Sequence, residues 1–296
     1  MRVAAIQMQC DADRADNLAR ASLLIGRAAE QSAELVVLPE LFASLGRTTE
    51  MRGAAEPLEG PTVVWASALA RQHHCSIVAG SFVEREGEQL FNTSVLLDPE
   101  GALIAHYRKV HLFDIDVAGA TSRESDTFSA GDDAVVAPLS DTTKPDTTKP
   151  DTTKPDTIEA DGSTPDATKL GLTICYDLRF PELFRIEALR GAQLIAVPSA
   201  FTAATGADHW ELLVRARAVE NQVAIIAAAQ WGTSPDGVQR HGHALIVDAW
   251  GTVLAEAPGE GDTVIAADID LDAIAQLRKR LPSLANRRPD AYRWPD

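Results

Sequence analysis

Apolar runs with the composition of buried strands alternate with helical patterns along most of the chain, and this alternation limits the fold more than any other feature. Residues 2–10 and 34–40 form compact apolar runs, and between them apolar side chains recur at helical spacing over 14–32. Residues 91–98 and 102–109 flank a Pro-Glu-Gly turn, which predicts a hairpin. The other predicted strands are 75–82 and the runs KLGLTICY, QLIAVPSA, QVAIIAAAQ, HALIVDAWG and TVIAADID, and the other predicted helices are 62–74, 182–190, 207–221 and 270–280. This order predicts an α/β domain with at least one mixed sheet that is covered by helices.

One segment interrupts the alternation. Residues 141–157 read DTTKPDTTKPDTTKPDT and contain three tandem copies of TTKPD. Proline at every fifth position prevents helix and strand, and the repeat has no large apolar side chain to offset the entropy of ordering it. We predict a mobile, disordered insertion over about 140–168, between two strands of one domain and not between two domains. A short ligand motif for a proline-binding partner is the alternative.

Length and charge exclude several classes of protein. A chain of 296 residues can bury a substantial core, as one large domain or two small ones. Its net charge of −16 disfavours binding to nucleic acid and to anionic membranes. No stretch approaches the length of a membrane span, and the N-terminal apolar run is shorter than a signal sequence requires. A cytoplasmic location is therefore expected.

The three cysteines, Cys10, Cys75 and Cys175, form no CxxC pair, so neither a disulfide framework nor a zinc site is predicted. Cys175 follows the strand-like GLTI and precedes PELFRIEALR, in which Pro181 suits the start of a helix. The thiol is thus predicted at a strand-to-helix turn, where backbone N–H groups can face a developing negative charge. Taken alone, Cys175 fits a packed core thiol better than a nucleophile.

Two charged residues stand at predicted strand ends. Glu40 ends ELVVLPE, and α/β folds bind ligands at such ends. Lys109 ends ALIAHYRK, where an ammonium could hold a nearby thiol as thiolate and bind an oxyanion. An exposed loop carboxylate and a solvated basic strand end are the respective alternatives. Glu124, in TSRESDTF, carries no signal by itself.

Other chemical motifs are weak. His241 and His243 have the alternate spacing of two metal ligands on one strand face, but no third ligand appears at a convincing spacing. A structural role is favoured for both, and no metal is predicted. The chain contains no GxSxG, HExxH, P-loop or GxGxxG pattern. This weakens assignment as a serine hydrolase, a zinc protease or a nucleotide-binding protein.

Three segments in order, LPE (38–40), YRKVHLFD (107–114) and GLTICYDLRFPE (171–182), resemble the signature segments of the nitrilase superfamily, the carbon–nitrogen hydrolases. The first strand RVAAIQM and the closing segment DAWGTVLAEAPGEG are also similar to that family, so the resemblance covers nearly the whole chain apart from the insertion. It implies a four-layer αββα sandwich. We predict one domain over 1–280, interrupted by the insertion, and a C-terminal arm over 281–296.

The resemblance also implies a Glu–Lys–Cys triad, carried here by Glu40, Lys109 and Cys175, and a second glutamate whose position Glu124 matches. Cys175 would be the nucleophile and Glu40 the base, with Lys109 and the backbone N–H of Tyr176 as oxyanion donors. A thiolate paired with Lys109 is expected in preference to a neutral thiol. No cofactor is implied, because the chemistry requires only an acid, a base and a thiol.

Finer features resemble the Nit-type amidase branch, and deaminated glutathione amidases in particular. Tyr176-Asp177 stands where nitrilases that act on nitriles usually carry Trp-Glu. The implied reaction splits the small-molecule amide deaminated glutathione into 2-oxoglutarate and Cys-Gly through a thioester. ω-Amidase activity on 2-oxoglutaramate or 2-oxosuccinamate and N-carbamoyl amine hydrolysis are the enzymatic alternatives. An inactive scaffold of the same fold and a thiol redox sensor are the alternatives outside that chemistry.

An anionic substrate needs a cationic anchor, and Arg179, four residues after Cys175, is the candidate. A salt bridge with Asp177 or Glu182 is its structural alternative. Three further residues, Phe42, Phe201 and Thr205, are predicted to line the pocket because they lie near the motifs. Apolar residues on one face of 207–221 predict core packing, and the resemblance implies that this helix and the arm from Leu281 join two copies as a homodimer.

Overall fold

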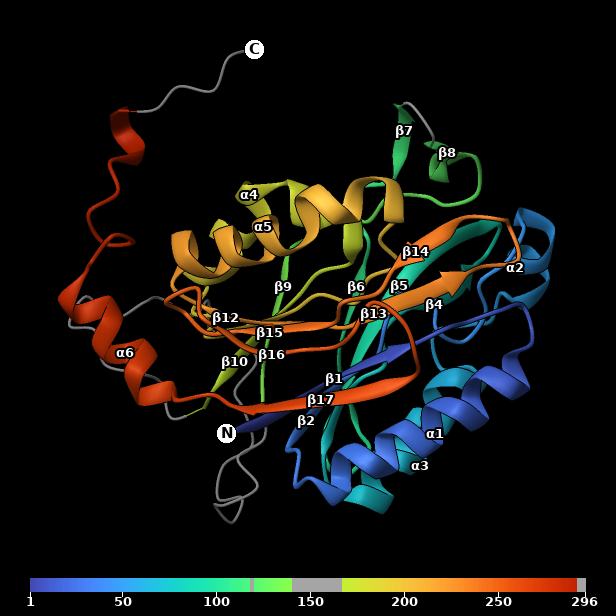
Figure 1. Cartoon of the computed structure of the whole chain (residues 1–296), viewed down its shortest axis with the longest axis horizontal. Coiled ribbons are helices and arrows are strands. Elements are labelled where there is room, and N and C mark those ends of the chain that lie inside the picture. Colours follow the sequence, from blue (N-terminus) through green and yellow to red (C-terminus); the bar gives the residue numbers. More distant parts are fainter. Residues whose placement is uncertain (118–119, 140–166, 292–296) are drawn as a thin grey trace.

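The computed structural model describes residues 1–117, 120–139 and 167–291. Two large sheets stack face to face, and helices cover their outer faces (Figure 1). Helices α1 (Arg14–Glu30) and α3 (Pro61–His73) lie on one sheet, and α4 (Pro181–Leu189) and α5 (Ala203–Asn221) lie on the other. The four-layer αββα sandwich implied by the motifs is confirmed.

The first sheet is mixed. Its strand order is β14-β13-β1-β2-β3-β5-β4, and β17 and β6 join it by pairing with β1 and β5. Strands β1, β2 and β3 are parallel, whereas β5 and β6 form the predicted hairpin. The bounds are β1 (Arg2–Met8), β2 (Leu35–Val37), β3 (Ser76–Val78), β4 (Phe82–Glu86), β5 (Gln89–Leu97), β6 (Leu103–Arg108), β13 (Ala229–Thr233), β14 (Gln239–His241) and β17 (Thr263–Asp268).

The second sheet has the order β16-β15-β12-β11-β10-β9. Its bounds are β9 (Val135–Pro138), β10 (Lys169–Leu172), β11 (Leu194–Ala196), β12 (Ala224–Ala227), β15 (Leu245–Val247) and β16 (Val253–Glu256). A separate hairpin, β7 (Asp114–Val117) and β8 (Ala120–Arg123), projects beside the sandwich (Figure 1). The sequence does not predict this hairpin, because β7 alternates over only four residues and β8 has no large apolar side chain.

The longer helices follow the predicted ranges closely. The side chain of Asp13 accepts the N–H of Asp16 and so begins α1, while Asp270 begins α6 (Leu271–Arg280) by accepting the N–H of Ala273. The remaining helical segments are α2 (Thr48–Ala54) and the 3₁₀ turns η1 (Glu124–Asp126), η2 (Cys175–Arg179) and η3 (Pro289–Ala291). None of the helices in the described ranges is long and apolar enough to cross a bilayer.

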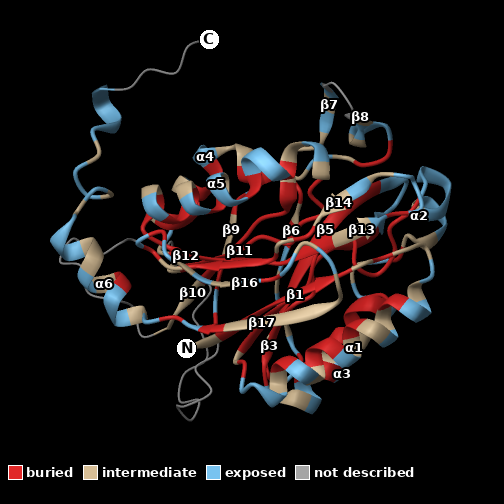
Figure 2. Cartoon of the chain, viewed as in Figure 1, coloured by how far each residue is buried: buried red, intermediate tan, exposed pale blue. Residues whose placement is uncertain are grey.

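Strand β1 shows why the central strands read as continuous apolar runs. Val3 and Ala5 face the core between the two sheets, whereas Ala4, Ile6 and Met8 face the core under α1. Both faces of the strand are therefore buried, and polar alternation disappears. Figure 2 shows the buried residues concentrated on the sheets and on the inner faces of the helices.

The predicted insertion lies between β9 and β10 in the sequence, and these two strands pair with each other. The N–H of Leu139 donates to the carbonyl of Thr168 at 2.7 Å, next to the pair of Pro138 and Lys169. The chain therefore leaves this sheet and returns to it at adjacent positions. Residues 140–166 lie outside the described residues, and their mobility stays a prediction. The same holds for residues 292–296 of the predicted arm.

Candidate active site

Glu40 lies just beyond the end of β2, in a loop that needs a glycine beside it. Gly80 has a φ of +37°, and a Cβ at this position would overlap the carbonyl oxygen of Pro39. The N–H of Leu41 donates to Ser81 Oγ at 2.8 Å. The loop holds Glu40 almost fully buried, at 4% exposure.

Cys175 begins the 3₁₀ turn between β10 and α4, at the predicted strand-to-helix turn. Its φ of +48° is unusual for a residue with a side chain, and such a conformation persists only where the surroundings hold it. The N–H of Cys175 donates to the carbonyl of Pro198 at 2.9 Å. The buried carboxylate of Asp177 accepts the Ile174 N–H at 2.8 Å and the Tyr107 hydroxyl at 2.7 Å. These bonds fix the turn that carries the thiol.

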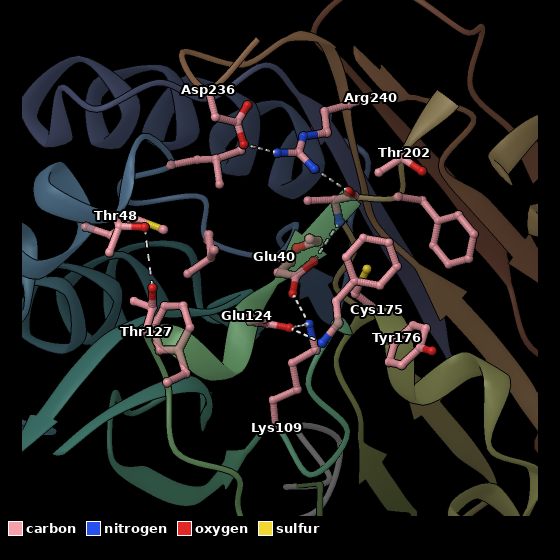
Figure 3. A pocket seen from close by; sticks show the side chains of 18 of the residues that line it. Glu40, Thr48, Lys109, Glu124, Thr127, Cys175, Tyr176, Thr202, Asp236 and Arg240 are labelled. Carbon is pink, nitrogen blue, oxygen red and sulfur yellow. Dashed lines mark hydrogen bonds and ion pairs between the residues drawn. The ribbon is translucent and has the colours of Figure 1, made fainter. Parts of the chain in front are cut away.

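Lys109 lies one residue beyond β6, and its ammonium joins two carboxylates. Its Nζ donates to Glu40 Oε1 at 2.8 Å and to Glu124 Oε2 at 2.8 Å. Glu124, which opens η1, also accepts the N–H of Phe113 at 2.6 Å. Figure 3 shows Glu40, Glu124 and Cys175 gathered around Lys109. An ammonium has three N–H groups, so one is left for a ligand after these two bonds.

The charges in this cluster shift one another's pKa values. Burial by itself would raise the pKa of Glu40, but the ammonium of Lys109 outweighs burial and holds that pKa below its usual value. Burial would lower the pKa of Lys109, and the charges of Glu124 and Glu40 instead raise it well above normal. Burial first, and then the charge of Glu40, raises the pKa of Cys175 well above that of a free thiol. The raised pKa of Cys175 favours a neutral thiol in the resting site over the expected thiolate–ammonium pair.

The cluster lines a cavity of about 400 Å³. Phe201, Thr205 and Tyr176 line the cavity with it. The further lining residues are Leu41, Leu45, Gly46, Arg47, Thr48, Met51, Phe113, Ser122, Arg123, Thr127, Phe128, Ala200, Thr202, Asp236 and Arg240. The cavity thus combines aromatic walls with hydroxyl and guanidinium groups, as small-molecule sites do.

Phe42 and Arg179 lie elsewhere than the sequence suggested. Phe42 is fully buried and packs on Trp65, with ring centroids 5.5 Å apart, in the core under the helices. Although Phe42 is close to Glu40 in the sequence, it does not line the cavity, because the tight loop points the two side chains to different sides. Arg179 Nη1 lies 3.3 Å from His209 Nδ1, and its guanidinium covers the ring of Phe201 at 5.2 Å. Its suggested partner Asp177 is used by Ile174, Tyr107 and His111.

Three groups that sequence reasoning missed hold Glu40 in place. Asn92 Nδ2 donates to Glu40 Oε1 at 2.9 Å and to Glu124 Oε1 at 3.1 Å. The N–H of Ala200 donates to Glu40 Oε2 at 2.9 Å, and Gln230 Nε2 donates to the Glu40 carbonyl at 2.6 Å. Asn92 could have been recognised in the sequence as a polar residue inside an apolar strand. Ala200 could not, because it contributes its backbone N–H, which every residue except proline has.

The two histidines singled out by spacing do not form a metal site with other side chains. His243 Nδ1 lies 2.9 Å from Glu256 Oε1, and the rings of His241 and His243 lie 4.7 Å apart. Across the described ranges, no group of three or more His, Cys, Asp or Glu side chains is placed to hold a metal ion. Trp210 Nε1 donates to the carbonyl of His243 at 2.6 Å, which joins the segment between β14 and β15 to α5.

Known proteins resemble this chain over nearly its whole length. The sequence pattern of the carbon–nitrogen hydrolase family matches residues 2–279. The omega-amidase NIT2 of Mus musculus is 39% identical over 292 residues, which cover 98% of this chain and 96% of that protein. The deaminated glutathione amidase of Synechocystis sp. is 40% identical over 288 residues, which cover 96% of this chain and 97% of that protein. The crystal structure of the C. elegans NitFhit protein superposes with a TM-score of 0.82 at 33% identity, over 99% of this chain and 66% of that longer chain. The chain therefore belongs to the carbon–nitrogen hydrolase family, as its three motifs predicted.

Proposed function

We propose that this protein is a cysteine-dependent amidase that hydrolyses a small anionic amide through a thioester on Cys175. One observation carries the proposal: Cys175, Glu40, Lys109 and Glu124 meet in a single buried cluster on the wall of the cavity. The cluster supplies a nucleophile, a base and a cationic oxyanion donor, which together suffice for amide hydrolysis. The names of the two curated relatives support an amide as the substrate.

In the acylation half-reaction, Glu40 accepts the thiol proton as the Cys175 sulfur attacks the amide carbonyl carbon. The carbonyl π electrons move to oxygen, where the free N–H of Lys109 and the backbone N–H of Tyr176 bind the oxyanion. One such donor contributes about 3 kcal/mol to transition-state stabilisation. The tetrahedral intermediate collapses, the C–N bond breaks, and Glu40 returns its proton to the departing amine. Glu124 orients Lys109 throughout and faces the substrate amide.

In the deacylation half-reaction, water enters the site that the amine has left. Glu40 removes a proton from this water as its oxygen attacks the thioester carbonyl carbon. The same donors bind the second oxyanion, and the Cys175 sulfur then leaves and regains its proton from Glu40. The acid is released and the cluster returns to its resting protonation state, with a neutral thiol.

Deaminated glutathione is the proposed substrate, and 2-oxoglutaramate is the alternative. The two amides share the same acyl chain, whose own carboxylate requires a cation. For this carboxylate we propose Arg179, which does not itself line the cavity but whose guanidinium lies over the rings of Tyr176 and Phe201, which do. Replacing Arg179 by lysine should raise KM for an anionic amide more than for a neutral one, and equal effects on both would remove the assignment.

The decisive experiment measures product release from deaminated glutathione, 2-oxoglutaramate and a plain aliphatic amide. Wild type, Cys175→Ala and Cys75→Ala are run side by side. Cys75 is a matched control because it is also a buried free thiol, but it lies in the core under the helices. We expect the Cys175 variant to lose turnover and the Cys75 variant to keep it. Turnover that survives in the Cys175 variant would refute the nucleophile.

We also propose that the protein is a cytoplasmic homodimer. The thiols of Cys10, Cys75 and Cys175 are free, which suits a reducing compartment. Large apolar side chains are exposed on the outer side of α5 and next to it, with Leu212 at 66%, Val219 at 52% and Trp250 at 69% exposure. Exposed apolar residues that gather in one patch mark interaction surfaces.

A further inference from the structure

We propose that Arg240 binds a carboxylate on the amine half of the substrate, and so selects amides whose leaving amine is acidic. The proposal rests on the amidase function above and extends it from the reacting amide to the group that departs. Cys-Gly carries such a carboxylate, whereas the ammonia released from 2-oxoglutaramate does not. Arg240 would therefore decide between the two proposed substrates.

Arg240 stands on β14, lines the cavity, and is held rigidly. Its Nη2 donates to Asp236 Oδ2 at 2.9 Å, its Nε to Ser234 Oγ at 3.0 Å, and its Nη1 to the Ala200 carbonyl at 3.1 Å. A guanidinium has five N–H groups, so two remain beyond these three bonds to the described residues. Carboxylates are bound well by two N–H groups in a fixed fork, and a side chain held in advance loses little entropy on binding.

The backbone of Ala200 shows on which side of the reacting group Arg240 lies. The carbonyl of Ala200 accepts from Arg240, and its N–H donates to Glu40 Oε2 at 2.9 Å. Lys109 binds the other carboxylate oxygen, Oε1. Figure 3 shows Arg240 and Asp236 beyond Glu40, on the far side from Lys109. The oxyanion binds on the Lys109 side and Glu40 protonates the departing amine, so Arg240 adjoins the amine half.

Two other arginines line the cavity, and both are less suited to select a carboxylate. Arg47 and Arg123 are exposed, and Arg123 Nη1 donates to the carbonyls of Ile115 and Ser122. The Arg240 side chain is only 10% exposed, so water competes less for its N–H groups and its charge is screened less. In a protein with a net charge of −16, such a local cation offsets the general repulsion of anions.

The size of the cavity also leaves room for an amine half. A volume of about 400 Å³ equals on the order of a dozen water volumes, and lies within the range of sites for drug-sized ligands. Asp236 neutralises Arg240 when no substrate is bound, while its own side chain stays 29% exposed. A substrate carboxylate can then reach the remaining N–H groups without displacing the bond that holds the arginine.

The test compares three amides with one acyl chain: deaminated glutathione, its C-terminal carboxamide, and 2-oxoglutaramate. We expect wild type to prefer the carboxylate over the carboxamide in kcat/KM by roughly 10- to 100-fold, the range of one charge-assisted hydrogen bond. Arg240→Met should lose this preference, and its kcat/KM should fall much less on 2-oxoglutaramate than on deaminated glutathione. Arg240→Lys, which keeps the charge without the fork, should fall between them. Arg27→Met, an exposed arginine on α1, is the matched control for net charge and should change nothing.

Three results would overturn the proposal. Equal losses on all three amides in Arg240→Met would make Arg240 a positioning residue for Ala200 and Glu40. Equal kcat/KM of wild type on the carboxylate and the carboxamide would exclude the anchor role of Arg240, and this result does not depend on whether the methionine variant folds. The third result comes from calorimetry: if Cys175→Ala/Arg240→Met binds deaminated glutathione as tightly as Cys175→Ala does, Arg240 does not bind the substrate carboxylate. If wild type hydrolyses none of the amides, the proposed function is wrong, and the binding comparison still tests whether Arg240 binds the carboxylate.

Discussion

At the scale of single residues, the protonation of the site is set by how its charges are arranged and not by any one side chain. Glu40 is ionised although it is buried, because Lys109 stands 2.8 Å away. Burial and the charge of Glu40 together outweigh the ammonium and raise the pKa of Cys175, which favours the neutral thiol. In the proposed reaction the thiolate therefore forms as its proton passes to Glu40 during attack.

This coupling predicts an unusual effect of Glu40→Gln. The substitution removes a negative charge that raises the pKa of Cys175 and leaves Lys109 next to the thiol. We expect the pKa of Cys175 to fall relative to wild type, while turnover drops about 10²–10⁴-fold because an amide cannot accept the proton. The ultraviolet absorbance of the thiolate, titrated against pH with the Glu40→Gln/Cys175→Ala protein as blank, measures this pKa.

The same blank subtracts the titration of the other two thiols. Burial raises the pKa of Cys75 to about 11 and also raises that of Cys10. An unchanged or higher Cys175 pKa in the Glu40→Gln protein would contradict the coupling. Lost turnover with an unshifted pKa would leave Glu40 as a base whose charge does not control the thiol.

Glu187 on α4 is a buried acid that the reaction does not use. Both of its carboxyl oxygens lack a hydrogen-bond partner among the described residues, and burial, followed by the charge of Asp177, raises its pKa well above normal. A raised folded-state pKa gives stability that is fully present below the unfolded-state value and is lost as pH rises toward the folded-state value. Wild type should therefore lose stability as pH increases above the ordinary range of glutamate.

Glu187→Gln should remove this loss. We expect the variant to match wild type in acid and to become more stable than wild type as pH rises, by up to about 1.4 kcal/mol for each pH unit between the two pKa values. Urea unfolding at a series of pH values measures the difference. Exposed Glu30→Gln on α1 is the control and should leave the pH dependence unchanged. A variant of Glu187 that runs parallel to wild type at every pH would show that this carboxyl is ionised.

At the scale of secondary-structure elements, the pairing of β9 with β10 makes it possible to test whether the fold requires the segment between them. Leu139 and Thr168 are joined by a hydrogen bond of the kind that flanks a two-residue hairpin turn. We expect replacement of 140–167 by Asn-Gly to preserve the fold and turnover. Shortening the loop from about 28 to 2 residues should stabilise the protein by roughly 2 kcal/mol, because each halving of loop length returns about 0.6 kcal/mol of closure entropy.

Thermal unfolding and amide turnover check this variant together. Deletion of the TTKPD repeats alone, residues 142–156, is the milder control and should also leave turnover intact. A large loss of turnover in the milder deletion would mean that the repeat takes part in function. Loss in the hairpin variant alone would instead locate the contribution in the flanking residues of the segment.

Elements were predictable where burial forced a pattern. Helix α1 and strands β1 and β5 are long, and each buries one or both of its faces, so their apolar patterns are clear. The hairpin of β13 and β14 escaped prediction, because β14 is an edge strand of only three polar residues and has no apolar alternation. That hairpin carries Arg240, so the missed element is also the one that bears the proposed selectivity.

At the scale of the whole molecule, the exposed apolar patch of Leu212, Val219 and Trp250 predicts a dimer. Arg215 Nε donates to the carbonyl of Gly251 at 2.9 Å, which joins α5 to the turn that carries Trp250, and Val219 packs against Gly251 of the same turn. We expect light scattering to give twice the chain mass, and Leu212→Glu/Val219→Glu to give a folded monomer, because two charges would be buried without partners.

Leu23→Glu is the matched control for this experiment. Leu23 is as exposed as Leu212, at 66%, but lies on α1 in the opposite outer layer. The control should stay dimeric. A wild-type monomer would remove the proposed dimer, and a control that dissociates would place the interface on the α1 layer instead.

The sequence by itself determined the family and the layered architecture, and it pointed to Glu40, Lys109 and Cys175 as the proposed reacting side chains. Alternating apolar runs follow from burial on both faces of a strand, and the chemistry of Glu40, Lys109 and Cys175 follows from their residue types and motif order. Only the tertiary structure decided how these groups meet: the neutral thiol, the support from Asn92 and Ala200, the turn of Phe42 into the core, and the place of Arg240. These depend on distance, burial and backbone direction between segments far apart in the chain, which local sequence patterns do not encode.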